Sequence, residues 1–234
     1  MKALGAGSGT QAFASGWYGK LPAAGDFVAR RVPGAFCDAW GRWLQGALEG
    51  ARARLGSGWS EDFLSMPVWR FAIAPGLLTP NAWAGVMVPS VDKGGRYFPL
   101  ALASALPAAP VDLVATLFAA RRWFDDMERV AFFAIGPRAD MAALDAQTSA
   151  RPFPPEYVRP AGAAPRDRAP SEDLACMALR ERRSGAPRAA WLAPASEIFG
   201  ATLLVCDGLP PAGPFCAMMD GRWQEHGWAP CGAG

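Results

Sequence analysis

The sequence predicts a single α/β domain, a three-layer α/β/α sandwich around a central mixed sheet. Three observations point to this fold. Helical and strand-like segments alternate along the 234 residues, an order typical of one sheet between two helical layers. The strand-like segments are almost continuously apolar, as expected for strands covered on both faces. Hydrophobic residues make up 51% of the chain and charged residues 19%, a composition that excludes a disordered protein.

The first elements follow a short N-terminal stretch. Residues 1–14 are small and polar, and we expect a flexible tail there. Residues 17–21 are predicted to form a strand that enters a turn at 22–25. A helix is expected to begin near Pro33, since proline has no amide hydrogen to leave unpaired in the first turn, and to end by Gly56. Its apolar residues recur every three or four positions and form one stripe: Phe36, Trp40, Trp43, Leu44, Ala47, Leu48 and Ala51.

The middle of the chain is predicted to supply the centre of the sheet. Residues 68–74, 82–88 and 97–103 read as buried strands, and a loop with proline and glycine joins the first two. Helices are expected to follow over 112–129 and 139–147.

The C-terminal part begins with an irregular loop. Residues 151–169 are rich in proline, which favours a loop or an internal linker. Strands over 189–192 and 201–206 and a short helix over 215–219 complete the prediction. A split into two domains at the loop is the alternative. Neither half carries enough strands to close its own sheet, so we predict one domain over residues 15–230.

Composition argues against several classes of partner and cofactor. The net charge is +2 and the arginines are scattered, so no basic track for nucleic acid is expected. The longest uncharged stretch, residues 71–91, contains prolines and reads as two strands, so no membrane insertion is expected. The five cysteines are widely spaced and accompany a single histidine. We therefore expect free thiols in a reducing cytoplasm and no metal site.

The sequence offers no catalytic or cofactor-binding residue to name. His226 lies close to the C-terminus, and we expect it to be an exposed tail residue. The carboxylates at 61–62, 125–128 and 172–173 stand in local runs beside basic residues, as on solvated helix faces or loops. Motifs for a hydrolase, a zinc protease or a phosphate-binding loop are absent from the sequence. The chain is therefore predicted not to be an enzyme.

Two segments carry charges among otherwise apolar residues and glycine–proline turns: 16–31 and 83–100. We expect their turns to converge and to present six side chains to a protein partner: Lys20, Asp26, Arg30, Ser90, Asp92 and Arg96. Because a buried charge is costly unless paired, an internal ion-pair network is a second interpretation, in which the aspartates also tie down their turns. A third is a hydrolase or nucleotide-processing enzyme that uses Asp26, Ser90 and Asp92 in a cleft.

The same segments carry a family resemblance. The motifs GWYGKLPAAGDFVARR at 16–31, WRFAIAPG at 69–76 and WAGVMVPSVDKGGRYFPL at 83–100 occur in the order found in the TagF (ImpM) family. The resemblance implies a three-layer fold and a cytoplasmic, post-translational repressor of type VI secretion. It also implies partners among the cytoplasmic components of that system, including a forkhead-associated scaffold protein. Some members are fused to a phosphatase domain, and this chain resembles the stand-alone form. It departs from the family at Lys93-Gly94, where Asp-Arg-Val-Gly-Arg is common.

Overall fold

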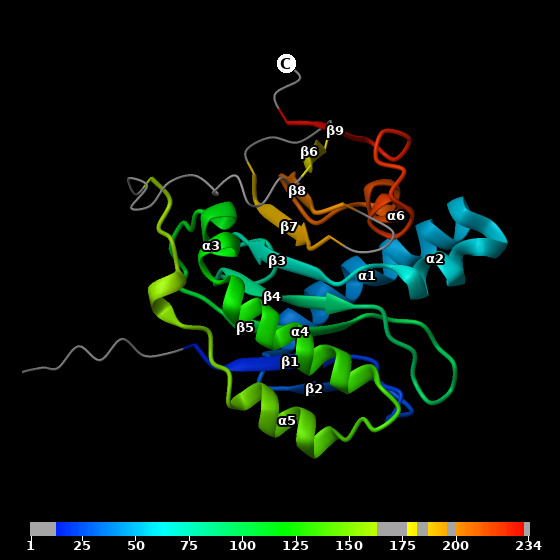
Figure 1. Cartoon of the computed structure of the whole chain (residues 1–234), viewed down its shortest axis with the longest axis horizontal. Coiled ribbons are helices and arrows are strands. Elements are labelled where there is room, and N and C mark those ends of the chain that lie inside the picture. The colour runs from blue at the N-terminus through cyan, green and yellow to red at the C-terminus, as the bar shows by residue number, and fades with distance from the viewer. Residues whose placement is uncertain (1–12, 163–176, 182–186, 196–199, 232–234) are drawn as a thin grey trace, which may run out of the picture.

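The strands of the protein form one sheet. The computed structural model describes residues 13–162, 177–181, 187–195 and 200–231 (Figure 1). Its strands are β1 (Ser15–Gly19), β2 (Val28–Arg30), β3 (Trp69–Ile73), β4 (Trp83–Val88), β5 (Leu100–Ala105), β6 (Met177–Glu181), β7 (Ala189–Ala193), β8 (Thr202–Cys206) and β9 (Trp228–Pro230). They form a nine-stranded sheet in the order β2-β1-β5-β4-β3-β7-β8-β6-β9. All neighbours are antiparallel except β6 and β8, so the sheet is mixed, as predicted.

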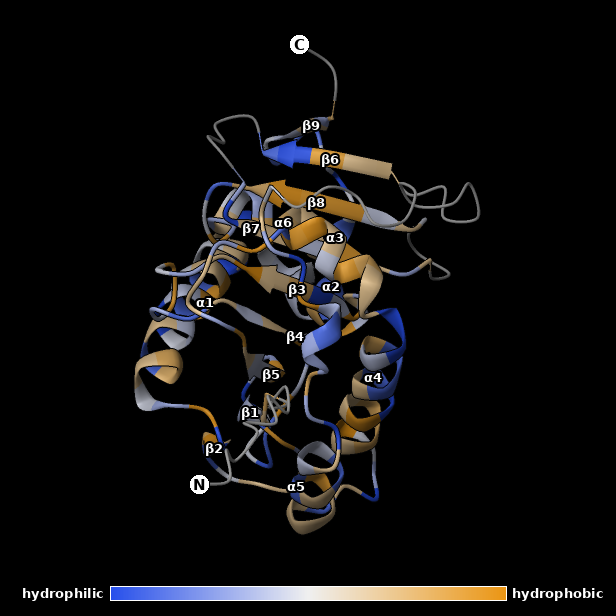
Figure 2. Ribbon diagram, turned by 90° about the vertical axis from the view of Figure 1, so that its left-hand side faces the viewer, coloured by the Kyte–Doolittle hydropathy of each residue, from blue (hydrophilic) through white to orange (hydrophobic). Residues whose placement is uncertain are grey.

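Helices cover both faces of this sheet. One layer consists of α1 (Gly34–Leu55), α2 (Trp59–Ser65) and α6 (Ala212–Asp220). The other consists of α3 (Leu113–Ala119), α4 (Arg121–Ile135) and α5 (Met141–Ser149). Figure 2 shows α1 and α4 on opposite sides of the strands. Two short 3-10 helices, η1 (Gly56–Gly58) and η2 (Pro155–Tyr157), complete the described elements. The predicted α/β/α sandwich is confirmed.

The apolar strands are explained by these two layers. In β3, alternate side chains point to opposite faces: Trp69, Phe71 and Ile73 pack in the core beneath α1, whereas Ala72 packs in the core beneath α4. Every residue of β3 is buried. Arg70 also points toward the α4 side, and its pairing there is described below.

An aromatic cluster fills the core beneath α1. The ring centroids of Trp40 and Phe71 are 4.8 Å apart, and those of Phe36 and Trp83 are 4.3 Å apart. Such pairs contribute about 0.5–1.5 kcal/mol beyond the burial of their area. The indole N–H of Trp40 finds no hydrogen-bond acceptor within the described residues, nor does that of Trp17 in the other core.

Several predicted elements match the structure closely. The long helix α1 begins after Pro33 and ends at Leu55, as the apolar stripe predicted. The strands β3, β4, β7 and β8 lie within the predicted segments, except that β7 runs one residue further. The last helix, α6, extends the predicted segment in both directions.

Two central elements differ from the prediction. The predicted single helix over 112–129 is wrong, because the chain breaks at Ala120 into α3 and α4. Asp112 does start the first helix, and its carboxylate accepts a hydrogen bond of 2.9 Å from the amide of Ala115. The third strand begins at Leu100 instead of residue 97. Before it, Tyr97 forms a bridge with Val91 and so belongs to the turn.

The ends of the predicted domain show local pairing. Phe13, placed in the tail by the prediction, exchanges two backbone hydrogen bonds with Phe153, of 3.1 and 2.7 Å. Residues 1–12 lie outside the described part. Within the proline-rich segment, residues 155–157 form η2 and Pro160 bridges to Val111. Residues 163–169 are also outside the described part.

A helix able to span a bilayer would need to be both long and apolar. None of the helices formed by the described residues meets that requirement.

Candidate functional site

The two charged segments meet at a buried ion pair. Lys20 follows β1, and Asp92 lies in the turn between β4 and β5. Lys20 Nζ is 2.6 Å from Asp92 Oδ2, and the two side chains are 5% and 0% exposed. The Ser90 hydroxyl donates to the Lys20 carbonyl at 2.7 Å, and the Lys93 amide donates to the Ala24 carbonyl at 2.9 Å. The two turns are therefore joined through side chains and backbone.

Asp92 is the centre of this junction. Its carboxylate accepts hydrogen bonds of 2.9 Å from the amides of Gly94 and Arg96 and one of 2.8 Å from Arg96 Nε. The Lys20 ammonium is the main cause that holds the pKa of Asp92 well below its usual range, and the donors of Arg96 and Gly94 lower it further. Burial of the carboxylate acts in the opposite direction. Asp92 therefore remains ionised at neutral pH. Arg96 also donates to the Gly25 carbonyl and closes the junction on its outer side.

The six predicted side chains divide into two groups. Lys20, Ser90, Asp92 and Arg96 come together, and the first three are buried. These contacts correspond to an internal ion-pair network and to an aspartate that ties down its turn. Asp26 and Arg30 are exposed, and their bonds are to the neighbouring backbone groups of Phe27 and Ala29. Of the six, only Asp26, Arg30 and Arg96 are exposed.

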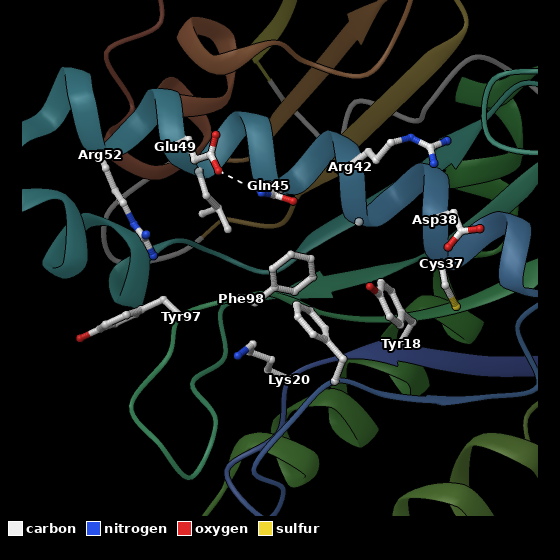
Figure 3. A pocket seen from close by; sticks show the side chains of 13 residues that line it. Tyr18, Lys20, Cys37, Asp38, Arg42, Gln45, Glu49, Arg52, Tyr97 and Phe98 are labelled. Atoms are coloured by element: carbon white, nitrogen blue, oxygen red, sulfur yellow. Dashed lines mark hydrogen bonds between the residues drawn. The ribbon is translucent and has the colours of Figure 1, made fainter.

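An open groove of about 530 Å³ lies between α1 and the two joined turns (Figure 3). It is lined from the two segments by Tyr18, Lys20, Phe27, Tyr97 and Phe98, and from α1 by Cys37, Asp38, Gly41, Arg42, Gln45, Leu48, Glu49 and Arg52. Its size falls in the range of ordinary ligand pockets. The predicted convergence of the two segments thus produces a concave surface, with α1 as its second wall.

Aromatic rings form the side of the groove opposite α1. Phe27 stacks on Tyr18 with ring centroids 5.8 Å apart and meets Phe98 edge to face at 4.7 Å. The Lys20 ammonium lies 4.9 Å from the Phe27 centroid, so this ring also covers the buried ion pair. Phe27 remains 44% exposed. On α1, Gly41 leaves room for the phenol: a Cβ there would lie 3.0 Å from the Tyr18 hydroxyl.

The α1 wall carries charges of alternating sign. Asp38, Arg42, Glu49 and Arg52 are exposed, and among the described residues none of them has an ion-pair partner. Glu49 accepts a hydrogen bond of 3.1 Å from Gln45, and the Arg52 guanidinium lies 4.2 Å from the ring centroid of Trp59. Sequence reasoning missed this wall, because these residues fall off the apolar stripe of α1 and read as an ordinary solvated face.

Two titratable side chains, Tyr18 and Cys37, lie beside Asp38 at one end of the groove. Burial raises the pKa of the Tyr18 phenol, and the neighbouring Cys37 and Asp38 raise it further. Burial, followed by the Asp38 charge, also raises the pKa of the Cys37 thiol. Both groups are therefore neutral at physiological pH, so the charges of α1 at this end are those of Asp38 and, one turn further along, Arg42, whose side chain is directed toward this end in Figure 3.

The single histidine lies elsewhere and is not an exposed tail residue. The His226 side chain is 11% exposed, and its Nε2 atom is 2.9 Å from Asp220 Oδ2. The same carboxylate oxygen accepts a bond of 2.8 Å from Arg222. The expectation of an exposed residue is wrong, because Trp228 is buried and donates to the Pro214 carbonyl at 3.0 Å, which fastens this segment to α6. In the described portion, no three His, Cys, Asp or Glu side chains are grouped to hold a metal.

Two of the predicted solvated carboxylates have a structural role. Arg70 of β3 donates to Glu128 at 2.5 Å and to Asp125 at 2.7 Å, both on α4. The Arg70 side chain is 8% exposed and that of Glu128 is 14% exposed, so this pair is largely removed from water. An arginine within an apolar strand was the available sequence signal for such a partner. The third carboxylate run, at 172–173, lies outside the described residues.

Comparisons with known proteins agree with this architecture. A search of curated sequences finds no match. The crystal structure of PA0076 from Pseudomonas aeruginosa PAO1 is similar to this chain with a TM-score of 0.72 and 32% sequence identity. The similarity covers 89% of this chain and 95% of that one. Residues 16–150 match the TagF N-terminal domain, described as type VI secretion system-associated. This range includes both charged segments and the whole α1 wall, and the chain belongs to the TagF family of type VI secretion system-associated proteins.

Proposed function

We propose that this protein is a cytoplasmic regulator that represses type VI secretion by binding other proteins, without catalysis. Its family places it with the secretion system. The observation that carries the binding role is the groove, where the two motif-bearing segments and α1 combine the exposed Phe27 ring and the half-buried rings of Tyr18 and Tyr97 with charges that have no ion-pair partner among the described residues. Aromatic side chains at a surface are enriched in protein interfaces.

The buried junction supports binding through rigidity. The Lys20–Asp92 ion pair and the Ser90 hydrogen bond fix the turn that carries Phe27. A surface held in its binding conformation loses less entropy on association. Lys20, Ser90 and Asp92 thus act as internal supports in this proposal, and the exposed Asp26, Arg30 and Arg96 side chains are contact candidates.

The alternative of a hydrolase receives less support from the same residues. A general base works best with a pKa near the operating pH, whereas the pKa of Asp92 is shifted well below its usual range. A serine nucleophile needs a base to take its proton, but the Ser90 hydroxyl donates to the carbonyl of Lys20. Asp26 is exposed and accepts a bond from the adjacent amide of Phe27.

The proposed partners are cytoplasmic components of the secretion system, in particular a forkhead-associated scaffold protein, as the family resemblance implies. A pull-down of the purified scaffold from the same bacterium tests this. We expect capture by the wild type and by Arg122→Glu, which changes an exposed charge on α4 on the opposite layer. The double variant Asp26→Arg, Arg96→Glu, checked for folding by circular dichroism, should lose capture.

A secretion assay tests repression itself. Overproduction of the protein in its own bacterium should reduce the amount of secreted components in the culture medium, and deletion of the gene should raise it. Unchanged secretion in both strains would exclude the repressor role. Equal capture of the scaffold by the wild type and the folded double variant would instead show that the contact surface lies elsewhere.

A further inference from the structure

We infer that the groove binds an extended segment of a protein partner that has a basic side chain at one end and an acidic side chain at the other. The basic side chain pairs with Asp38 and the acidic one with Arg52. This inference rests on the proposed binding function and specifies the chemistry of the bound segment. Three observations carry it: the charges of the wall, the size of the groove and the aromatic rings between its ends.

The charges define the two ends. Figure 3 shows Asp38 beside Cys37 and Tyr18 at one end and Arg52 reaching toward Tyr97 at the other. Lys20 and Asp92 are paired with each other. Asp38 and Arg52 form no ion pair within the described part of the chain. An incoming segment of opposite polarity would therefore gain ion pairs without breaking any, and the existing contact of Arg52 is the one with the Trp59 ring.

The middle of the wall is less free to pair. Glu49 is bonded to Gln45, and Figure 3 shows Arg42 directed along α1 rather than toward the rings. The two terminal charges thus dominate the recognition of a ligand. They are separated by fourteen positions of α1, which corresponds to about 21 Å at 1.5 Å per residue.

The size of the groove favours an extended segment over a helix. A helix about 10 Å wide and 21 Å long occupies roughly 1,600 Å³. The groove is open and encloses about 530 Å³, so it could take in only one side of such a helix. An extended chain advances about 3.3 Å per residue and covers the same distance in about six steps. A heptapeptide therefore spans Asp38 and Arg52 with its first and last side chains.

The aromatic side of the groove lies between the two ends. In an extended segment the first, third, fifth and seventh side chains point to one side. With the outer two paired to the charges, the inner two face this aromatic side, where Phe27 is exposed and Phe98 is largely buried beside it. Because Phe27 is 44% exposed, an apolar side chain placed on it would bury surface that is now in contact with water.

Selection from a random heptapeptide library displayed on phage tests the inference without assuming a sequence. The immobilised full chain should enrich peptides with a basic residue and an acidic residue six positions apart and apolar residues between them. Asp38→Lys gives the groove two cationic ends and should enrich peptides that are acidic at both ends. Arg52→Glu gives it two anionic ends and should enrich peptides that are basic at both ends. Arg122→Glu on α4 should select the same peptides as the wild type.

Binding of a synthetic peptide from the wild-type selection then gives the size of the effect. Fluorescence anisotropy should show dissociation constants about tenfold higher for Asp38→Lys and for Arg52→Glu than for the wild type, the equivalent of one well-placed charge pair. Arg122→Glu should bind as the wild type does. All three substitutions are at exposed positions, so circular dichroism should show unchanged folding.

Several results would overturn the inference. These are the absence of enrichment over an unrelated bait, the same peptides from all four baits, or enriched peptides without terminal charges. Self-association that is lost on charge reversal, with no peptide selected, would assign the groove to a second copy of the chain. If peptide selection fails while the scaffold protein is still captured, the inference falls and the proposed function stands. If peptides with a basic and an acidic end are selected but the scaffold is not captured, the inference about the groove stands and the proposed scaffold partner is wrong.

Discussion

The ammonium of Lys20 lies 2.6 Å from the carboxylate of Asp92, and this contact connects two turns that are 72 residues apart in the sequence. Both side chains are buried, and Phe27 covers the pair. Breaking a buried ion pair leaves a charge without a partner, which costs more than the pair itself contributes. The ion pair is therefore expected to hold the groove in shape.

The junction should make stability depend on pH. The pKa of Asp92 is lowered in the folded protein from an ordinary value of 3.8. The unfolded chain therefore takes up a proton first as the pH falls, so the contribution of Asp92 is complete above about pH 4 and is lost at lower pH. Urea unfolding at pH 7, 5, 4 and 3 should show that Asp92→Asn is less stable than the wild type at the higher pH values. The difference in unfolding free energy between Asp92→Asn and the wild type should become smaller below pH 4.

An exposed aspartate of the neighbouring turn provides the control. Among the described residues, the Asp26 side chain accepts the amide hydrogen of Phe27, which an asparagine side chain can also accept. Asp26→Asn should therefore follow the wild-type pH profile. A difference between Asp92→Asn and the wild type that is the same at pH 3 as at pH 7 would contradict the assignment of an ionised, buried Asp92.

Removal of the Arg70 charge should destabilise the side of the sheet that packs on α4. Arg70→Met keeps most of the side-chain volume but leaves Glu128 largely buried without its cation. The free energy of unfolding should fall by about 3 kcal/mol. The double variant Arg70→Met, Glu128→Met should recover much of this loss, since apolar replacement of a whole buried pair is often neutral. Equal loss in the single and double variants would show that the pair itself is not responsible.

Two glycines with different surroundings should respond in opposite directions to alanine. A Cβ at Gly16 of β1 would lie 2.3 Å from the Arg30 carbonyl oxygen, so Gly16→Ala should push β2 away and cost about 1–3 kcal/mol of stability. A Cβ at Gly46 of α1 meets no atom within 4 Å. Gly46→Ala should therefore stabilise the protein by up to about 1 kcal/mol through helix propensity. The melting temperatures of both variants, compared with that of the wild type, measure these effects. A Gly16→Ala variant as stable as the wild type would show that β1 and β2 can move apart without loss of stability.

The described cysteines should differ in reactivity. Burial, and the nearby Glu181 charge, raise the pKa of Cys206 to about 12. Burial, and then Asp220, raise the pKa of Cys216 to about 11. Because the thiolate is the reactive form, both should resist iodoacetamide at pH 8. Cys231 is exposed and should be labelled first. Mass spectrometry of the labelled peptides gives the order, and rapid labelling of Cys206 in the folded protein would contradict its burial.

The sequence predicted best those elements whose pattern depends only on burial. The stripe of α1 and the apolar runs of β3 and β4 each reflect one buried face or two, so their bounds follow from the residues alone. The break at Ala120 has no glycine or proline to mark it. It could not be predicted, because it depends on how α3 and α4 pack on the sheet.

The site was predictable in part for a similar reason. Charges beside apolar turns indicated that the segments 16–31 and 83–100 would meet, and Lys20 and Asp92 do so. The α1 wall was missed, because Asp38 and Arg52 look like any solvated helix residues until the fold places them opposite Phe27. A groove made from three separated segments is a property of their packing and has no local signature in the chain.

Proton exchange at the unpaired indole N–H groups of Trp17 and Trp40 can report how each helical layer opens. Among the described residues neither has an acceptor, so only the exclusion of water prevents their protons from exchanging with solvent. Trp40 lies in the core under α1, and Trp17 lies in the core under α4. Proton exchange at each ring therefore reports the opening of its own layer, because no internal hydrogen bond has to break first. In heavy water, the exchange rate of the Trp40 indole proton should measure opening on the α1 side of the sheet, and that of Trp17 should measure opening on the α4 side.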